Sequence, residues 1–374
     1  MDDQGASRTM VRDERLTEPE PEEVARAARA ADGRGVADVT PISKGINAIY
    51  RVRFADGEEA VLKAATFNSA AELRPEPYLL GTLADETALP VPDVLAIADE
   101  GGPLGVFHFL VEHREGRQIR DLDGLSWRER EQLVAAVGRH LARLHEFRLA
   151  GAEASVGSRI DAEECGPLRT TDPEEGATPD FTTEGGGSWG DVFASLADHP
   201  ISLVEQVQCG DDPGRFADLV PDIVAAFDGV ADAIAEPERP SVLHRDFHLA
   251  NLLLGSDAEG RLGVRTVLDF GDPYVGDYRL DLAFAEDATI RVQLPTDDRA
   301  NDLCALLRRS YARERGIDPD EIVNRNYPYY LLVQRSRWMS VALDWESCDD
   351  PAAVERAYRS FVRGQLAEIE ERAT

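Results

Sequence analysis

Three residues with oxygen-bearing side chains stand at spacings that suit metal-assisted chemistry. Asp246 is followed five residues later by Asn251, and Asp269 comes after a predicted hairpin, in Asp-Phe-Gly. A carboxylate within reach of a hydroxyl can accept its proton, and the oxygens of Asn and Asp suit Mg²⁺. Phosphoryl transfer from ATP needs such a set, because it consists mainly of orienting a hydroxyl and holding magnesium against the triphosphate. We therefore predict Asp246 as the catalytic base, and Asn251 and Asp269 as magnesium ligands.

The neighbours of Asp246 favour this interpretation over a simpler one. A lone Asp near a turn is usually a helix or turn cap. Here it stands in His-Arg-Asp, ahead of an apolar run and of a second apolar strand that ends in Asp-Phe-Gly, a combination that chance rarely produces. We expect the ring of His244 to hydrogen-bond to backbone and hold the loop. His248 either lies near phosphate or acceptor, or is a solvated loop residue.

Two further carboxylates follow Asp269 in the sequence. Asp277 and Asp281 stand eight and twelve positions after Asp269. Neither can be presumed to face the metal, so we predict that both hydrogen-bond to loop backbone behind the metal ligands and fix the metal site.

The chain has almost no lysine: of 40 basic residues, only Lys44 and Lys63 are lysines. A lysine on a strand usually lies at the surface. The scarcity, and the place of Lys63 in a predicted strand, favour instead a compact ammonium that grips the phosphates of ATP. We predict Glu76 as its partner, with Glu72 as the alternative. Gly45 lies in a turn that either covers the phosphates with backbone N–H groups or is an ordinary hairpin turn.

Strands and one helix are predicted to position the lysine. Residues 1–30 are expected to form an acidic flexible tail, in which 22–31 have a helical pattern. Apolar alternation and turn residues predict strands from residue 36 onward, at 46–54, 60–64, 93–98 and 104–112. A helix over 70–84, interrupted by two prolines, carries Glu76. Residues 31–113 are therefore predicted to be an antiparallel sheet with one helix.

Residues 114–374 are predicted to be mainly helical and to hold the catalytic loop and the acceptor site. A buried stripe recurs at spacings of four, four and three residues, at Leu133, Val137, Leu141 and Leu144. Residues 148–188 are rich in Gly, Thr, Asp and Glu and are predicted to be a long, partly disordered insertion. Further helical patterns occupy residues 189–207, 219–234, 299–315, 320–346 and 351–371.

Charge restricts the partners of the protein. Its 374 residues carry a formal net charge of −31, so nucleic acid and anionic membranes are repelled. An acidic surface poor in lysine is typical of proteins adapted to high salt, where screening removes self-repulsion. The four cysteines form no CxxC pair, and no apolar run is long enough to span a membrane. We expect a soluble, halophilic, cytoplasmic protein.

The segments His244-Arg-Asp-Phe-His-Leu-Ala-Asn251, Leu268-Asp-Phe-Gly-Asp272 and Val275-Gly-Asp-Tyr-Arg-Leu-Asp-Leu-Ala283 resemble the aminoglycoside phosphotransferase and choline kinase-like family. The resemblance runs from about residue 36 to the C-terminal helices. It implies an α+β, bilobal protein-kinase-like fold and an ATP-dependent kinase that phosphorylates a hydroxyl of a small molecule.

Carried over by that resemblance, Asp246 is the catalytic Asp, Asn251 and Asp269 bind the metal, and Lys63 with Glu76 binds the ATP phosphates. The sequence departs from the family at Arg245, where Gly is common, and in a glycine-poor phosphate loop. GTP in place of ATP stays open, as does the acceptor: aminoglycosides, macrolides, choline-like alcohols, homoserine, ketosamines and sugars all agree with the resemblance.

Two other functions remain open from the sequence. His244, Asp246 and His248 form an HxDxH pattern that also suits a hydrolase with a transition metal. That interpretation leaves Lys63 and Asn251 without roles. The other alternative is a kinase-like protein that binds nucleotide without turnover, although all the predicted catalytic residues are present.

Overall fold

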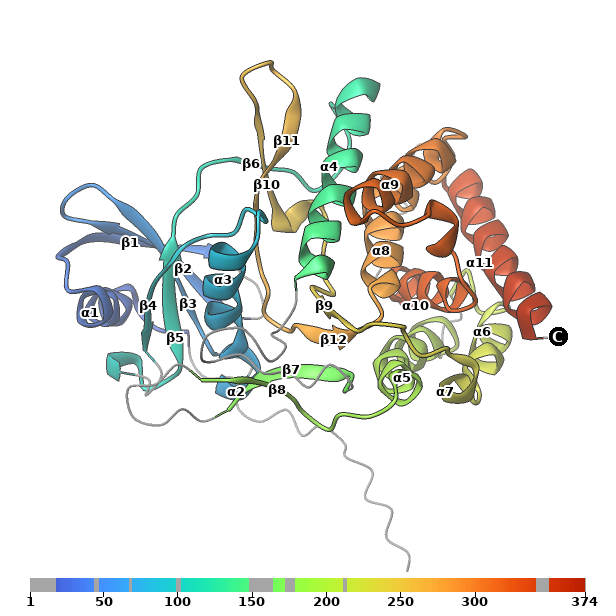
Figure 1. Cartoon of the computed structure of the whole chain (residues 1–374), viewed down its shortest axis with the longest axis horizontal. Helices are drawn as coiled ribbons and strands as arrows, with labels where there is room; N and C mark the ends of the chain where they lie inside the picture. The colour runs from blue at the N-terminus through green and yellow to red at the C-terminus, as the bar shows by residue number, and fades with distance from the viewer. Residues whose placement is uncertain are drawn as a thin grey trace, which may run out of the picture. The chain divides into compact units, whose positions relative to one another are not determined.

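The computed structural model describes residues 18–43, 47–66, 69–98, 102–147, 164–171, 179–210, 214–340 and 350–373. The chain divides into two compact units (Figure 1). The first unit comprises residues 1–77 and 93–113, and the second comprises residues 78–92 and 114–374. Antiparallel sheet dominates the first and helix the second, which confirms the predicted α+β class.

The first unit is built on a five-stranded antiparallel sheet with strand order β1-β2-β3-β5-β4. In β2, Tyr50, Val52 and Phe54 are buried and the two arginines between them are exposed, because alternate side chains point to opposite faces. The strands are β1 (Val36–Ser43), β2 (Ala48–Phe54), β3 (Glu59–Ala64), β4 (Val94–Ala98) and β5 (His108–Glu112).

Helix α1 (Pro21–Asp32) packs on this sheet and buries Val24, Ala27 and Ala28 completely. The helical pattern at residues 22–31 is therefore confirmed, and the boundary of the predicted tail at residue 30 is corrected: an apolar face holds residues 21–30 against the sheet. The first unit thus has more than the one predicted helix.

The predicted helix over residues 70–84 is two helices, α2 (Ala70–Leu73) and α3 (Pro75–Glu86). Pro75 is the first residue of the second helix. A backbone N–H at that position would have no acceptor within the helix, so the N–H that proline lacks costs no hydrogen bond. A 3₁₀ turn, η1 (Gly102–Leu104), precedes β5.

Helices α4 (Trp127–Glu146) and α9 (Ala300–Arg315) pack closely together in the second unit. Gly138 permits this approach, because a Cβ there would lie 2.6 Å from the carbonyl oxygen of Leu307. The predicted apolar stripe of α4 is fully buried, at Leu133, Val137, Leu141 and Leu144.

Two small antiparallel sheets complete this unit. The first has the order β11-β10-β6, from β6 (Arg117–Gln118), β10 (Leu252–Ser256) and β11 (Leu262–Val267). The second has the order β8-β7-β12-β9, from β7 (Gly166–Thr170), β8 (Phe181–Thr183), β9 (Ser241–Leu243) and β12 (Tyr274–Gly276). The predicted loop at 148–188 thus contains two strands among its described residues. These strands are too short for an alternation of apolar and polar residues to be recognised in the sequence.

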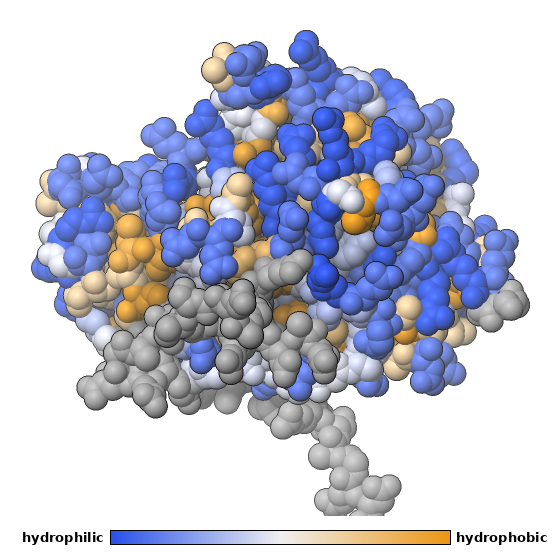
Figure 2. Space-filling model, viewed as in Figure 1, coloured by the Kyte–Doolittle hydropathy of each residue, from blue (hydrophilic) through white to orange (hydrophobic). Residues whose placement is uncertain are grey.

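The predicted helix over 219–234 is interrupted by Gly229, whose φ of 69° leaves the helical region. No described helix is long and apolar enough to cross a membrane. The face in Figure 2 is mainly hydrophilic. The remaining elements are α5 (Trp189–Gln208), α6 (Val220–Phe227), α7 (Val230–Ala233), η2 (Leu249–Asn251), α8 (Arg279–Glu286), the π-helical turn η3 (Asp287–Arg291), η4 (Pro319–Glu321), α10 (Tyr327–Ser340) and α11 (Pro351–Ala373).

Candidate active site

His244 holds the loop between β9 and η2. The backbone N–H of Asp246 donates to its Nδ1 at 3.2 Å, and its Nε2–H donates to the carbonyl oxygen of Leu268 at 2.9 Å. Both ring nitrogens are therefore occupied by backbone groups, as predicted. The next residue, Arg245, has a φ of 63°, a region that glycine adopts freely and other residues rarely do.

The carboxylate of Asp281 fixes the same loop from helix α8. It accepts the backbone N–H of His244 at 2.7 Å and that of Arg245 at 2.9 Å. Its third donor is Nε2 of His145, at 3.2 Å, whose Nδ1 accepts the hydroxyl of Tyr311 at 3.1 Å. Burial lowers the pKa of His145 against the opposing effect of Asp281, so the ring is neutral.

The predicted contact between Asp281 and loop backbone is present. His145 lies on α4, 136 positions from Asp281, so no local pattern in the sequence connects the two.

Asp277 differs from the prediction, because it does not contact the catalytic loop. Its carboxylate accepts the hydroxyl of Tyr330 at 2.9 Å, the side-chain amide of Asn326 at 3.2 Å and the backbone N–H of Arg279 at 3.1 Å. The indole of Trp189 donates to the same Tyr330 hydroxyl at 2.6 Å. Asp277 therefore joins the start of α8 to α5 and α10.

Asp246 and Asn251 are in direct contact. Nδ2 of Asn251 donates to the backbone carbonyl and to Oδ2 of Asp246, both at 2.9 Å. Because both neighbours are acceptors, the amide nitrogen must face them and the amide oxygen points away. That oxygen makes no hydrogen bond with a described residue and remains available to a cation.

His248 is a hydrogen-bond donor to Asp246. Its Nδ1 accepts the backbone N–H of Ala250 at 3.2 Å, so Nε2 carries the proton and lies 3.3 Å from Oδ2 of Asp246. Burial acts to raise the pKa of Asp246, but the hydrogen bond from His248 and the positive charge of Arg337 act against it, and that pKa lies below its ordinary value. The Asp246 side chain is 45% exposed, so an ionised carboxylate can meet a substrate.

Hairpin β10–β11 brings Asn251 and Asp269 to the same place. Leu252 pairs with Val267 at the base of the hairpin, and the backbone N–H of Leu268 donates to the carbonyl of Asn251 at 2.9 Å. Asp269 follows in an exposed position with a φ of 64°. A non-glycine residue in this conformation is strained, which is a feature of functional sites.

These residues fit magnesium and do not fit the hydrolase alternative. An amide oxygen and a carboxylate are hard ligands of the kind that Mg²⁺ prefers. Both nitrogens of His244 are engaged with backbone. Among the residues that the structure describes, no group of three or more His, Cys, Asp or Glu side chains is arranged to hold a metal ion.

Lys63 and Glu76 form a buried ion pair in the first unit. Nζ of Lys63 lies 2.6 Å from Oε2 of Glu76, and their side chains are only 8% and 4% exposed. Because the side chain of Lys63 is buried, the alternative that this lysine lies at the surface is wrong. Glu72 instead caps α2, because its carboxylate accepts the backbone N–H of Ser69 at 2.8 Å. Gly45 lies outside the described residues.

Sequence reasoning missed Arg337 of helix α10. Its guanidinium lies 5.3 Å from the ring centre of Phe284, which is 6.1 Å from the ring of His248. The positive charge of Arg337 is among the groups that lower the pKa of Asp246. No pattern in the sequence distinguishes it from the other arginines.

A model of the phosphotransferase enzyme family matches residues 38–322. No curated protein matches the chain. Several solved structures are similar. A thermostable variant of aminoglycoside phosphotransferase APH(4)-Ia, in complex with ADP and hygromycin B, is 18% identical with a TM-score of 0.57, over 91% of this chain and 98% of that one.

Amicoumacin kinase hAmiN, in complex with AMP-PNP and Ca²⁺, is 14% identical with a TM-score of 0.57, over 95% of this chain and 94% of that one. A proposed aminoglycoside phosphotransferase from Ralstonia eutropha is 17% identical with a TM-score of 0.56, over 94% and 97%. At such identities the similarity shows the fold, which is kinase-like as predicted.

Proposed function

The chain belongs to the phosphotransferase enzyme family and is an ATP-dependent kinase of a small molecule, and from this premise we propose which residues carry out the transfer. Asp246 accepts the proton of the acceptor hydroxyl. The hydroxyl oxygen then forms a bond to the γ-phosphorus, and the bond from that phosphorus to the oxygen that leaves with ADP breaks. The contact of Asn251 with the Asp246 carboxylate carries this proposal.

Asn251 and Asp269 are proposed to hold Mg²⁺ through the amide oxygen and the carboxylate. When bound, the ion neutralises charge on the phosphates. Asp281 and His244 keep the loop in shape, since they occupy its backbone groups. The hydrogen bond from His248 favours the ionised form of Asp246. Together with the bond from Asn251, it holds the Asp246 carboxylate in place.

Lys63 is proposed to bind the α- and β-phosphates, with Glu76 as its orienting partner. The buried pair at 2.6 Å supports this role, because the carboxylate of Glu76 fixes the position of the ammonium group. Gly45 is proposed to cover the phosphates through backbone N–H groups. ATP is favoured over GTP because solved structures with this fold contain ADP and AMP-PNP.

The acceptor is proposed to be a hydroxylated small molecule bound by the second unit. Trp338, Asp344 and Trp345 are its candidate contacts, of which only Trp338 lies in the described residues. One similar structure holds hygromycin B and another is named for amicoumacin, which supports a small molecule as the acceptor. With 71 acidic residues against 40 basic ones, we favour a metabolic role in a salt-rich cytoplasm over antibiotic resistance.

A transfer screen tests the proposal. Radiolabelled ATP and Mg²⁺ are supplied in molar KCl with a library of hydroxylated metabolites, using the wild type, Asp246→Asn and the exposed control Asp320→Asn. We expect Asp246→Asn to lose about 10²–10⁴-fold in kcat while it still binds a fluorescent ATP analogue. Full activity in Asp246→Asn would refute the mechanism. If the wild type bound ATP tightly but transferred phosphate to no compound, the alternative of a nucleotide-binding protein without turnover would be favoured.

A further inference from the structure

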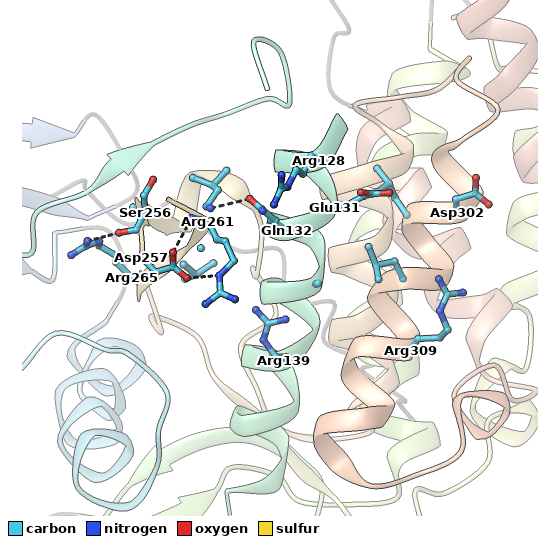
Figure 3. A pocket seen from close by; sticks show the side chains of 17 residues that line it. Arg128, Glu131, Gln132, Arg139, Ser256, Asp257, Arg261, Arg265, Asp302 and Arg309 are labelled. Carbon is cyan, nitrogen blue, oxygen red and sulfur yellow. Dashed lines mark hydrogen bonds and ion pairs between the residues drawn. The ribbon is translucent and has the colours of Figure 1, made fainter. Parts of the chain in front are cut away.

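A cavity of about 900 Å³ lies between helix α4, hairpin β10–β11 and helix α9 (Figure 3). All three elements belong to the second unit. Asp246, Asn251 and Asp269 are absent from its lining, so it is separate from the catalytic loop. Its size lies within the range of small-molecule sites.

Arginine dominates the charge of this cavity. Five arginines line it against three acidic residues, in a chain whose net charge is −31. The arginines are Arg128, Arg139, Arg261, Arg265 and Arg309. Figure 3 shows Arg128, Gln132 and Arg139 along one side of α4, with Arg309 on α9. A local excess of positive charge is unexpected on a surface selected for acidity.

Three of these guanidinium groups are not in direct contact with a carboxylate among the residues that the structure describes. Arg261 binds the carboxylate of Asp257 at 2.7 Å, and Arg265 donates to the carbonyl of Ser256 at 2.9 Å. Arg128, Arg139 and Arg309, in contrast, make no hydrogen bond or ion pair with a described residue. Their charge is therefore available to a ligand.

Two of the cavity arginines, Arg139 and Arg261, repel each other. Burial is the largest cause of the lowered pKa of Arg139, and the negative charge of Glu314 opposes it. The positive charge of Arg261 adds to the lowering, together with those of Arg143 and Arg313 outside the cavity. A bound anion would relieve this repulsion.

The spacing of the arginines determines the size of that anion. Arg128 and Arg139 are 11 residues apart on one helix, or about 16 Å along its axis. This is the separation of the two Cα atoms, so a molecule that carries several anionic groups can contact both arginines without bending either side chain far along the helix. A guanidinium binds phosphate or carboxylate through paired hydrogen bonds, so a molecule with several such groups satisfies the site.

We propose that this cavity binds a small molecule carrying two or more phosphate or carboxylate groups, at a site distinct from that of ATP. The hairpin wall is already held to α4, because the backbone N–H of Leu262 donates to Oε1 of Gln132 at 3.0 Å. The site is therefore formed before the ligand arrives.

Calorimetric titration with tripolyphosphate and with citrate tests the proposal. The full chain is used at the lowest KCl concentration at which thermal unfolding shows that it is folded, with Mg²⁺ and AMP-PNP in excess to fill the nucleotide site. The heat of each probe titrated into the same Mg²⁺ and AMP-PNP solution without protein is subtracted. We expect one equivalent of at least one probe to bind, and the variant Arg128→Gln/Arg139→Gln/Arg309→Gln to bind it at least about tenfold more weakly. The probe that binds more tightly identifies phosphate or carboxylate as the recognised group.

A matched variant controls for net charge. Arg29→Gln/Arg239→Gln/Arg325→Gln removes three exposed arginines outside the cavity, and it is expected to bind the probe like the wild type. Should the triple cavity variant unfold, Arg309→Gln alone, at an exposed position, is measured instead and is expected to weaken binding. No binding of either probe, or equal weakening in the matched control, would overturn the proposal. Asp246→Asn binds the probe normally if the cavity is independent of catalysis, so failure of the kinase mechanism remains distinguishable.

Discussion

The side-chain amide of Asn251 donates to both the backbone carbonyl and the carboxylate of Asp246, each at 2.9 Å. One residue thus orients the proposed base and turns its own oxygen toward the proposed metal. Asn251→Ala removes both functions, and we expect kcat to fall at least about 10²-fold and the magnesium requirement to rise. Activity measured across a magnesium titration checks this. An unchanged magnesium requirement would contradict the role of Asn251 as a ligand.

The pair Lys63 and Glu76 predicts a difference between two conservative variants. Lys63→Arg keeps the charge, but a planar guanidinium cannot occupy the place of a compact ammonium in a buried site. We expect KM for ATP to rise about tenfold or more. Glu76→Gln is expected to act in the same direction, and Glu72→Gln, which alters only the cap of α2, to leave KM unchanged. Steady-state kinetics with ATP varied separates them.

Asp281 and Asp277 are both fully buried but should differ in effect. Asp281→Asn turns an amide group toward the backbone N–H groups of the catalytic loop, so we expect kcat to fall together with stability, by about 1–3 kcal/mol. Asp277→Asn affects the contacts with Tyr330 and Asn326 and is expected to lower Tm with little change in kcat. Thermal unfolding and kinetics of both variants provide the comparison. If Asp281→Asn and Asp277→Asn had the same kcat, the assignment of Asp281 to the catalytic loop would be refuted.

Glu286 accounts for a pH dependence of stability. Burial opposes its ionisation, but Arg291 and Arg308 more than offset this, so its pKa lies below the ordinary value of 4.5. Its contribution is therefore fully present above pH 4.5 and is lost as the pH falls through the lower, folded pKa. Removing one partner of a buried pair costs about 3–5 kcal/mol.

We accordingly expect Glu286→Gln to lower stability by that amount at neutral pH and to flatten the dependence of stability on pH below 4.5. Denaturant unfolding across a pH series measures it. Glu368→Gln, in an exposed pair with Arg372, is the control and should cost less than about 1 kcal/mol.

Salt should stabilise the fold strongly. Repulsion among 71 acidic residues is screened by KCl, so we expect Tm to rise continuously into the molar range. Sucrose at matched osmolality controls for solvent exclusion. A Tm that does not depend on KCl would contradict adaptation to salt.

Local patterns were sufficient to single out the residues to which we assign the transfer, and their roles remain proposals. Lys63 stands out because lysine is rare, and Asp246, Asn251 and Asp269 lie within one short stretch around a hairpin. The buried stripe of α4 follows from its period. The catalytic-loop signal lies within residues 246–269 and the stripe of α4 within residues 133–144, whereas the lysine signal comes from the composition of the whole chain.

Contacts between distant segments were not predictable. Gly166 of β7 pairs with Val275 of β12, and the partner of Asp277 is Tyr330. Neither pair shares a periodic segment. The sequence pattern therefore predicts a loop at β7 and a support of the catalytic loop at Asp277, and the structure differs at both. The arginine cavity was likewise not predictable, because its lining residues come from three elements that are far apart in the sequence.

Lys63 is one of two lysines in the chain and the one that the structure describes, with its amine held beneath a carboxylate. A reagent that acylates primary amines therefore meets very few competing side chains. If Lys63 binds the phosphates as proposed, nucleotide lowers the acylation of this amine, and the mass of the intact protein measures the change.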